Sequence, residues 1–301
     1  MERNIFILWL QGWDKAPWLQ RRVLESWRIN NKGWNIELLD FNNLNNYVSD
    51  IDYIYHKKKK ISLQAKSDII RLSILKNIGG IWADSTLLCM QPLENWVYDA
   101  IEKSGFWMYH GHGYGLDSNL GPASWFIVSE RNNYNIASWK KKCDLFWQEN
   151  NSTIDYFWMD GLFKELLKSD AIFKKNWLKT PYLYCEEKGS SHSLASYNFK
   201  MEKNSKLLKD IFKKKPPYVL KLGGDFQKIF PDITSKIFKD SNVYYAIEMS
   251  KRNFIFKHNF STPLKISSPI KNKPYLFKLI KNLIKKFHHK IKTLKILLSK
   301  N

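Results

Sequence analysis

The amino-acid sequence predicts an α/β fold, in which helices flank a doubly wound and mostly parallel sheet, and three observations support it. First, Asn4–Leu10 is a continuous apolar run, which suits a strand that is covered on both faces. Second, apolar residues at helical spacing after Pro17 lead to a second strand at Trp34–Leu39, and strand, helix and strand form a βαβ unit. Third, a helix over Ile61–Asn77 precedes a short buried strand at Ile81–Ala83.

Length and composition fit a globular protein. The chain has 301 residues, 44% of them hydrophobic and 15% aromatic, so it can bury a sizeable core and does not have the composition of a disordered protein. We expect no signal peptide and no membrane-spanning helix, because no apolar run is long enough. The three cysteines are widely spaced and form no CxxC motif, which indicates free thiols in a reducing compartment and no zinc site: Cys89, Cys143 and Cys185.

The first candidate site residue is Asp40, which follows the second strand. Doubly wound sheets bind their ligands at the carboxyl ends of their strands, so Asp40 lies where a ligand is expected. On local grounds Asp40 fits equally well as a cap for a short helix at Asn42–Tyr47. The sequence leaves both interpretations open.

The helix over Ile61–Asn77 carries a polar stripe. Gln64, Asp68 and Arg71 are spaced i, i+4 and i+7, so they share one face of the helix. An acid and an arginine three residues apart are more often a surface ion pair than part of a functional site. Spacing alone therefore does not assign a function to this pair.

A glycine turn and an acidic segment follow that helix. Gly79-Gly80 is expected to end the helix as a left-handed cap, and Asp84, Ser85 and Thr86 lie at the carboxyl end of the next strand. A carboxylate in that position can hold a hard divalent cation, and the cation can neutralise a diphosphate. An Asx turn or a helix N-cap is the alternative, and the local pattern alone favours it.

In the second half of the chain, Asp160 is an isolated acid among apolar residues of a helical pattern over Tyr156–Lys168. An acid in such surroundings is either paired or has a raised pKa, and both states suit a catalytic or acceptor-binding role. An acid on the outer face of the helix is the alternative. Further strands and one helix are predicted at Leu87–Pro92, Phe106–Tyr109, Ser124–Ser129 and Ile136–Trp147.

The last part of the sequence, residues 266–301, differs from the domain expected over residues 1–265. Residues 271–301 contain ten lysines and no acid, and they supply about half of the net charge of +21. Their apolar residues recur at helical spacing, so a basic amphipathic helix lying on a membrane surface is expected. Packing onto the domain and binding to DNA are the alternatives, but no recognised nucleic-acid module accompanies the charge.

Several segments match sequence motifs of a known family. The first strand and its loop have the sequence FILWLQGW. Residues 67–86 contain SDIIRL, GGIW and the triplet Asp-Ser-Thr. Further matching segments are Ala16-Pro17, Ser26-Trp27, Ser124-Trp-Phe-Ile and Asp155-Tyr-Phe-x-x-Asp160. The combination spans residues 4–165 and resembles the capsular polysaccharide synthesis protein family. More distantly it is similar to glycosyltransferases with an Asp-x-Asp motif, including the yeast initiating mannosyltransferases and the clostridial glucosylating toxins.

The resemblance implies a GT-A fold that binds a nucleotide sugar. In such enzymes the first loop and the acid after the second strand contact the nucleoside, and the helix acid and arginine hold the donor sugar. Asp84 and Asp160 are the implied catalytic residues, with Asp160 orienting or deprotonating the acceptor hydroxyl. The implied donor-binding residues are Trp9, Gln11, Asp40, Asp68, Arg71, Gly80, Asp84 and Ser85.

The resemblance also implies a divalent cation, Mn²⁺ or Mg²⁺, held by Asp84. The sequence departs from the motif here, because Thr86 replaces the second acid, and a hydroxyl is a weaker ligand than a carboxylate for a hard cation. Thr86 and His258 are the further candidate ligands.

The function that the resemblance implies is a bacterial hexosyltransferase of capsule or surface polysaccharide synthesis. It would move a hexose from a UDP-sugar to a glycan or lipid-linked oligosaccharide, with retention of the anomeric configuration. We expect it in the cytoplasm, at the inner face of the cell membrane, with no nucleic acid as partner. The alternatives are a basic nucleic-acid-binding protein and a non-catalytic subunit of a capsule assembly complex.

Overall fold

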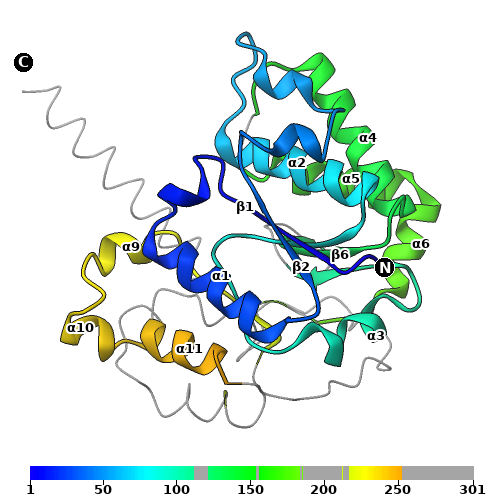
Figure 1. The fold of residues 1–301 in the computed structure, drawn as a ribbon. Helices are drawn as coiled ribbons and strands as arrows, with labels where there is room; N and C mark the ends of the chain where they lie inside the picture. Colours follow the sequence, from blue (N-terminus) through cyan, green and yellow to red (C-terminus); the bar gives the residue numbers. More distant parts are fainter. Residues whose placement is uncertain (112–120, 154–155, 184, 186–211, 213–216, 253–301) are drawn as a thin grey trace, which may run out of the picture. The chain divides into compact units, whose positions relative to one another are not determined.

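The computed structural model of the chain has the mixed α/β architecture that the sequence predicts, with helices on both faces of a central sheet (Figure 1). The predicted tail, residues 266–301, and His258 lie outside the described part of the chain. The residues that the structure describes are 1–111, 121–153, 156–183, 185, 212 and 217–252.

The central sheet has five strands in the order β2-β1-β3-β6-β5. β1 is parallel to both β2 and β3, whereas β6 is antiparallel to both β3 and β5, so four strands run in one direction and β6 runs against them. This confirms a mostly parallel sheet. A separate antiparallel pair is formed by β4 and β7. The strands are β1 (Asn4–Leu8), β2 (Asn35–Leu39), β3 (Gly80–Ala83), β4 (Leu87–Cys89), β5 (Phe106–His110), β6 (Pro122–Ser129) and β7 (Val219–Lys221).

Alternation along β1 divides the core into two layers. Ile5 and Ile7 pack into one apolar cluster and Phe6 and Leu8 into the other, because successive side chains of a strand point to opposite faces. Figure 1 shows α1 on one face of the sheet and α2, α4 and α5 on the other. The helices are α1 (Trp18–Asn30), α2 (Leu63–Asn77), α3 (Val97–Ile101), α4 (Tyr134–Glu149), α5 (Trp158–Ser169), α6 (Ala171–Lys179), α9 (Phe226–Ile229), α10 (Lys236–Lys239) and α11 (Asn242–Ser250).

Among the boundaries that differ from the predicted ones are those of α2 and of the short helix after Asp40. α2 begins at Leu63 rather than at Ile61, because the Ser62 hydroxyl accepts a hydrogen bond from the Ala65 N–H at 3.2 Å and caps the helix. The short helix expected after Asp40 is a single 3₁₀ turn, Leu44–Asn46. Other 3₁₀ turns lie at Trp13–Lys15, Asp52–Tyr55 and Leu93–Asn95.

The connection from α2 to β3 requires glycine. Gly79 and Gly80 have φ angles of +79° and +101°, and a Cβ atom on Gly80 would lie 2.7 Å from the carbonyl oxygen of Asn4. The tight turn reverses the chain, so β3 runs back along α2. The nine residues of helix from Asp68 to the turn and the four residues of β3 before Asp84 each cover about 13 Å. Asp68 and Asp84 therefore lie at the same level on either side of the turn.

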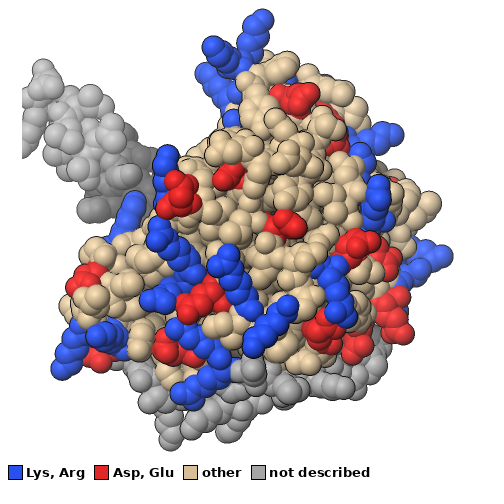
Figure 2. All heavy atoms as spheres, in the orientation of Figure 1, with Lys and Arg blue, Asp and Glu red and all other residues tan. Residues whose placement is uncertain are grey.

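The structure bears on the cysteines and on membrane-spanning helices. All three cysteines are free thiols, as predicted, and all three are buried. Within the described ranges no helix has the length and apolarity needed to cross a membrane. On the face shown in Figure 2, basic side chains are interspersed with acidic ones rather than gathered in one patch.

Candidate active site

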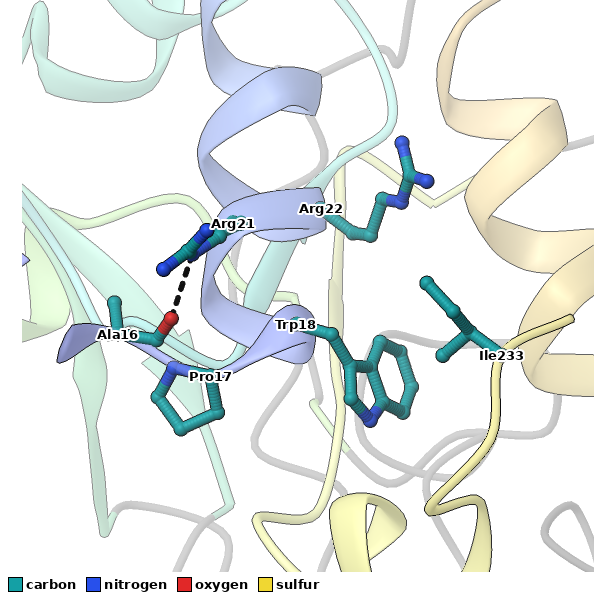
Figure 3. Close-up of a pocket in the computed structure, with 6 residues that line it drawn as sticks. All are labelled: Ala16, Pro17, Trp18, Arg21, Arg22 and Ile233. Atoms are coloured by element: carbon teal, nitrogen blue, oxygen red, sulfur yellow. Dashed lines mark hydrogen bonds between the residues drawn. The ribbon is translucent and has the colours of Figure 1, made fainter. Parts of the chain in front are cut away.

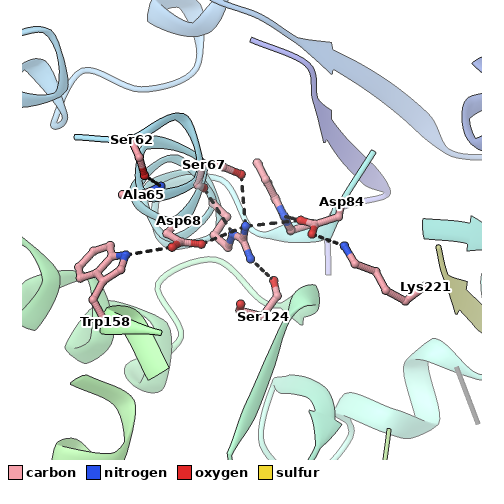
Figure 4. A network of polar contacts seen from close by, with 10 residues as sticks. Ser62, Ala65, Ser67, Asp68, Asp84, Ser124, Trp158 and Lys221 are labelled. Atoms are coloured by element: carbon pink, nitrogen blue, oxygen red, sulfur yellow. Dashed lines mark hydrogen bonds and ion pairs between the residues drawn. The ribbon is translucent and has the colours of Figure 1, made fainter. Parts of the chain in front are cut away.

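Two acids and an arginine meet at the carboxyl end of β3 (Figure 4). Asp68 and Arg71 come from α2, and Asp84 is the first residue after the strand. The Arg71 Nη2 atom lies 3.1 Å from Asp68 Oδ1 and 3.5 Å from Asp84 Oδ1. The guanidinium group thus joins the helix stripe to the strand end across the glycine turn.

The Arg71 side chain is almost fully enclosed, with 6% of its surface exposed. Its Nη1 atom donates to the Ser124 carbonyl at 2.6 Å, Nε donates to the Ser67 carbonyl at 3.4 Å, and Nη2 also donates to the Ser67 hydroxyl at 3.2 Å. Three acceptors thus face the two N–H groups of Nη2, and one acceptor each faces Nε and Nη1, so four of the five N–H donors of the guanidinium group are directed at protein oxygens. Arg71 therefore fixes the two carboxylates in place.

Asp84 is held by cationic and neutral donors. Lys221 Nζ lies 2.6 Å from Asp84 Oδ2, and the indole Nε1 of Trp82 donates to Oδ1 at 3.0 Å. Burial acts to raise the pKa of Asp84, but Lys221 and then Arg71 outweigh it and hold that pKa below its usual value. Asp84 is therefore a stable carboxylate at neutral pH.

Asp68 has a different environment. Its Oδ2 atom accepts a hydrogen bond from the indole Nε1 of Trp158 at 3.1 Å, which connects α5 to the site. Burial raises the pKa of Asp68 to about 6, since it outweighs the lowering effect of Arg71 and is reinforced by the nearby charge of Asp84. The two acids thus differ in how readily they take up a proton.

The raised pKa of Asp68 predicts a pH-dependent stability. Asp68 binds a proton more readily in the folded protein than in the unfolded chain, where its ordinary pKa is 3.8, so the contribution of Asp68 to stability should be lost as pH rises from about 4 to 6. Relative to Asp68→Asn, the wild type should lose about 2 kcal/mol over this range. Urea unfolding of both proteins at several pH values measures the difference, and parallel curves would contradict the assignment.

The other predicted donor-binding residues lie in different places. Trp9 and Gln11 follow β1, where the Trp9 N–H donates to the Leu39 carbonyl at 2.9 Å and Gln11 is exposed. The Asp40 carboxylate accepts from the N–H groups of Asn42 and Asn43 in a local Asx turn. The 3₁₀ turn Leu44–Asn46 has Asn43 at its N-cap and no side-chain cap, so Asp40 does not cap that helix.

Gly80 is not brought together with Asp84. It lies at the amino end of β3, whereas Asp84 follows the carboxyl end, and its closest constraint is the backbone of Asn4. Ser85 and Thr86 are partly exposed in the turn after β3. The Thr86 carbonyl accepts a hydrogen bond from the Leu222 N–H at 2.8 Å, which holds the segment after β7 beside this turn.

Asp160 lies in the first turn of α5 and is 5% exposed. It follows Trp158, whose indole reaches Asp68, by two residues. Tyr156 precedes the helix and is 71% exposed. The start of α5 borders the carboxylate cluster through the Trp158 indole, and Asp160 is buried in the same helical turn.

The polar atoms present do not fit a divalent cation. Each oxygen of Asp68 and Asp84 faces an N–H group or a cationic nitrogen. Within the ranges that the structure describes, no three His, Cys, Asp or Glu side chains are grouped to hold a metal ion. Thr86 offers only a hydroxyl and a carbonyl, which are weaker ligands than a carboxylate. The cation expected from the sequence stays a prediction.

Sequence reasoning did not single out Lys221 or Trp158. Trp158 lies within the matching segment Asp155–Asp160, so its position in that motif was a usable signal. Lys221 is one of 49 basic residues and lies in a three-residue strand, so no local pattern marks it.

A separate hollow lies at the start of α1 (Figure 3). Its volume is about 450 Å³, and Arg21 beside it donates to the carbonyls of Asp14 and Ala16. These contacts tie the loop after β1 to the helix. The lining shares no residue with the carboxylate cluster and consists of Ala16, Pro17, Trp18, Arg21, Arg22 and Ile233.

Comparison with known proteins gives one family and distant relatives. The model of the family described as capsular polysaccharide synthesis protein matches residues 1–229, which confirms the resemblance expected from the motifs. The chain is 24% identical over 161 residues to the O-glycosyltransferase braB of Annulohypoxylon truncatum, a match that covers 48% of this chain and 38% of the relative. It is 27% identical over 111 residues to the glycosyltransferase afumC of Aspergillus fumigatus, covering 33% of this chain and 28% of the relative.

These matches thus span well under half of the length of the two fungal proteins. Among solved structures, the chain is similar to the PaToxG glycosyltransferase at 15% identity and a TM-score of 0.38, with 59% of this chain and 75% of that chain covered. The names of the two curated relatives agree with the glycosyltransferase predicted from the sequence.

Proposed function

The chain belongs to the capsular polysaccharide synthesis protein family, and on this premise we propose that it is a glycosyltransferase of the GT-A type. It moves a hexose from a nucleoside-diphosphate sugar, a UDP-sugar in the first instance, to a growing surface glycan. The observation that carries the proposal is the enclosed cluster of Asp68, Arg71 and Asp84 at the carboxyl end of β3. Doubly wound sheets bind nucleotides at that edge.

The chemistry uses residues of this cluster and its border. The bond between the sugar C1 atom and the β-phosphate oxygen breaks, and its electron pair stays on the phosphate. The acceptor oxygen forms the new bond to C1, and its proton passes to the departing phosphate on the same face, which retains the anomeric configuration. Asp68 and Asp84 accept hydrogen bonds from sugar hydroxyls, and Asp160 orients the acceptor hydroxyl.

The test is hydrolysis of a panel of nucleotide sugars by the purified protein. UDP-, GDP-, ADP- and dTDP-hexoses are incubated with and without Mn²⁺, and the released nucleoside diphosphate is measured. At least one donor should be hydrolysed faster than its spontaneous rate. If no donor is hydrolysed, yet a nucleoside diphosphate raises the melting temperature, the protein is a non-catalytic subunit. A rise caused by oligonucleotides alone would favour the nucleic-acid-binding alternative.

The acceptor in this proposal is lipid-linked, and the basic segment of residues 271–301 brings the enzyme to the inner face of the cell membrane. Ten lysines without an acid attract anionic lipids, each contributing about 1 kcal/mol near the surface. Deletion of residues 271–301 should therefore release the protein from anionic liposomes and spare donor hydrolysis. Sedimentation with phosphatidylserine vesicles measures this, and unchanged binding would count against the membrane role.

A further inference from the structure

Lys221 is brought to the candidate site by strand pairing. β7 runs antiparallel to β4, with Lys221 opposite Leu87, and the Leu222 N–H donates to the Thr86 carbonyl. This register places the lysine beside the turn that contains Asp84. Its Nζ atom lies 2.6 Å from Asp84 Oδ2, on the oxygen that does not contact Arg71.

The two cations of the site differ in the donors they have left for a ligand. The contacts of Arg71 with protein acceptors use four of its five N–H groups, and 6% of its side chain is exposed. Lys221 has 20% of its side chain exposed, and its contact with Asp84 uses one of the three N–H donors of an ammonium group. Lys221 is therefore the better placed of the two to bind a further anion.

The charges around Asp84 indicate which anion Lys221 would bind. Asp68 and Asp84 are balanced by Arg71 and Lys221, and Lys221 occupies the Asp84 oxygen that a divalent cation would need. Thr86 supplies no second carboxylate to attract such a cation. A diphosphate that binds beside Asp84 would instead meet an ammonium group already held in position.

We propose that Lys221 binds the diphosphate of the donor and takes the role that a divalent cation has in Asp-x-Asp glycosyltransferases. The proposal rests on the proposed function. As the bond from C1 to the β-phosphate oxygen breaks, the electron pair moves onto that phosphate, and two N–H groups of Lys221 donate to its oxygens. The ammonium group keeps its proton, and its charge offsets the negative charge that develops on the leaving group.

The test compares Lys221→Met and Lys221→Arg with wild type in EDTA and in Mn²⁺, using the donor that the wild type hydrolyses fastest. Wild type should keep its activity in EDTA. Lys221→Met should lose about 100-fold in either condition, the usual cost of removing one donor to developing charge. Lys221→Arg should retain part of the activity, since it keeps the charge. Lys228→Met removes an exposed lysine of α9 and is the matched control.

A binding measurement separates this role from structural damage. Titration calorimetry in EDTA uses UDP and uridine, or the matching pair if the panel identifies another base. Lys221→Met should weaken binding of the diphosphate at least about tenfold and leave binding of the nucleoside unchanged. Equal weakening of both ligands would overturn the proposal.

Two outcomes distinguish this proposal from the one on which it rests. If activity is lost in EDTA and restored by Mn²⁺, and Lys221→Met behaves as wild type, the enzyme is a metal-dependent glycosyltransferase and only the role of Lys221 is wrong. If wild type hydrolyses no nucleotide sugar in either condition, the proposed function fails and the role of Lys221 fails with it.

Discussion

Asp84→Asn is expected to lower donor hydrolysis by about 1000-fold while the protein remains folded. The amide has the shape of the carboxylate but no charge, so it no longer holds Lys221 at 2.6 Å or attracts Arg71. It also presents an N–H group where a sugar or ribose hydroxyl needs an acceptor. Binding and charge stabilisation are thus both impaired by one substitution.

Steady-state kinetics with the best donor measures the loss, and circular dichroism with thermal unfolding verifies the fold. Asp52→Asn is the matched control, because Asp52 is an exposed acid in a 3₁₀ turn and its replacement should leave turnover unchanged. Wild-type turnover in Asp84→Asn would remove the carboxylate cluster from the active site.

Arg71→Ala is expected to reduce the free energy of unfolding by about 3–5 kcal/mol. The substitution leaves Asp68 and Asp84 largely buried without the group that joins them, and it removes the donor to the Ser124 carbonyl. A buried charge without a partner costs several kcal/mol, which is a large part of the stability of an ordinary domain. Arg71→Lys should fall between wild type and alanine, because it keeps the charge and loses the planar fork.

Urea unfolding at pH 7 measures this effect, and Arg22→Ala provides the comparison. Arg22 pairs with Glu25 at 3.0 Å, also three residues away on a helix, but both side chains are well exposed. An exposed pair of this kind contributes less than about 1 kcal/mol. If the two arginines prove equally dispensable, Arg71 does not hold the site together.

The local half of the site follows from the sequence. Asp68 and Arg71 are three residues apart on one helix, the turn is marked by its glycines, and Asp84 follows directly after the strand. Helical periodicity and chain reversal are enough to bring these groups to one level. The same reasoning anticipated helices flanking a mostly parallel sheet, because β1 is a continuous apolar run that suits a strand covered on both faces.

The contacts from residues far away in the sequence could not be predicted from local patterns. Lys221 reaches Asp84 across 137 residues, and its place depends on the register of a three-residue strand. Trp158 reaches Asp68 across 90 residues through the packing of α5. The resemblance gives Asp40 a nucleoside contact, whereas the structure shows its carboxylate in a local turn with Asn42 and Asn43, so its donor role stays a prediction.

The pairing of β4 with β7 also affects when the candidate site is completed during synthesis of the chain. β7 is the last strand in the described part of the chain, so during synthesis the ribosome releases the carboxylate cluster long before Lys221 emerges. Until then β4 has an open edge, and Asp84 lacks the ammonium group at its Oδ2 atom. A nascent chain that ends before residue 219 therefore carries the motifs of residues 4–165 but an incomplete candidate site, which is completed only when β7 pairs with β4.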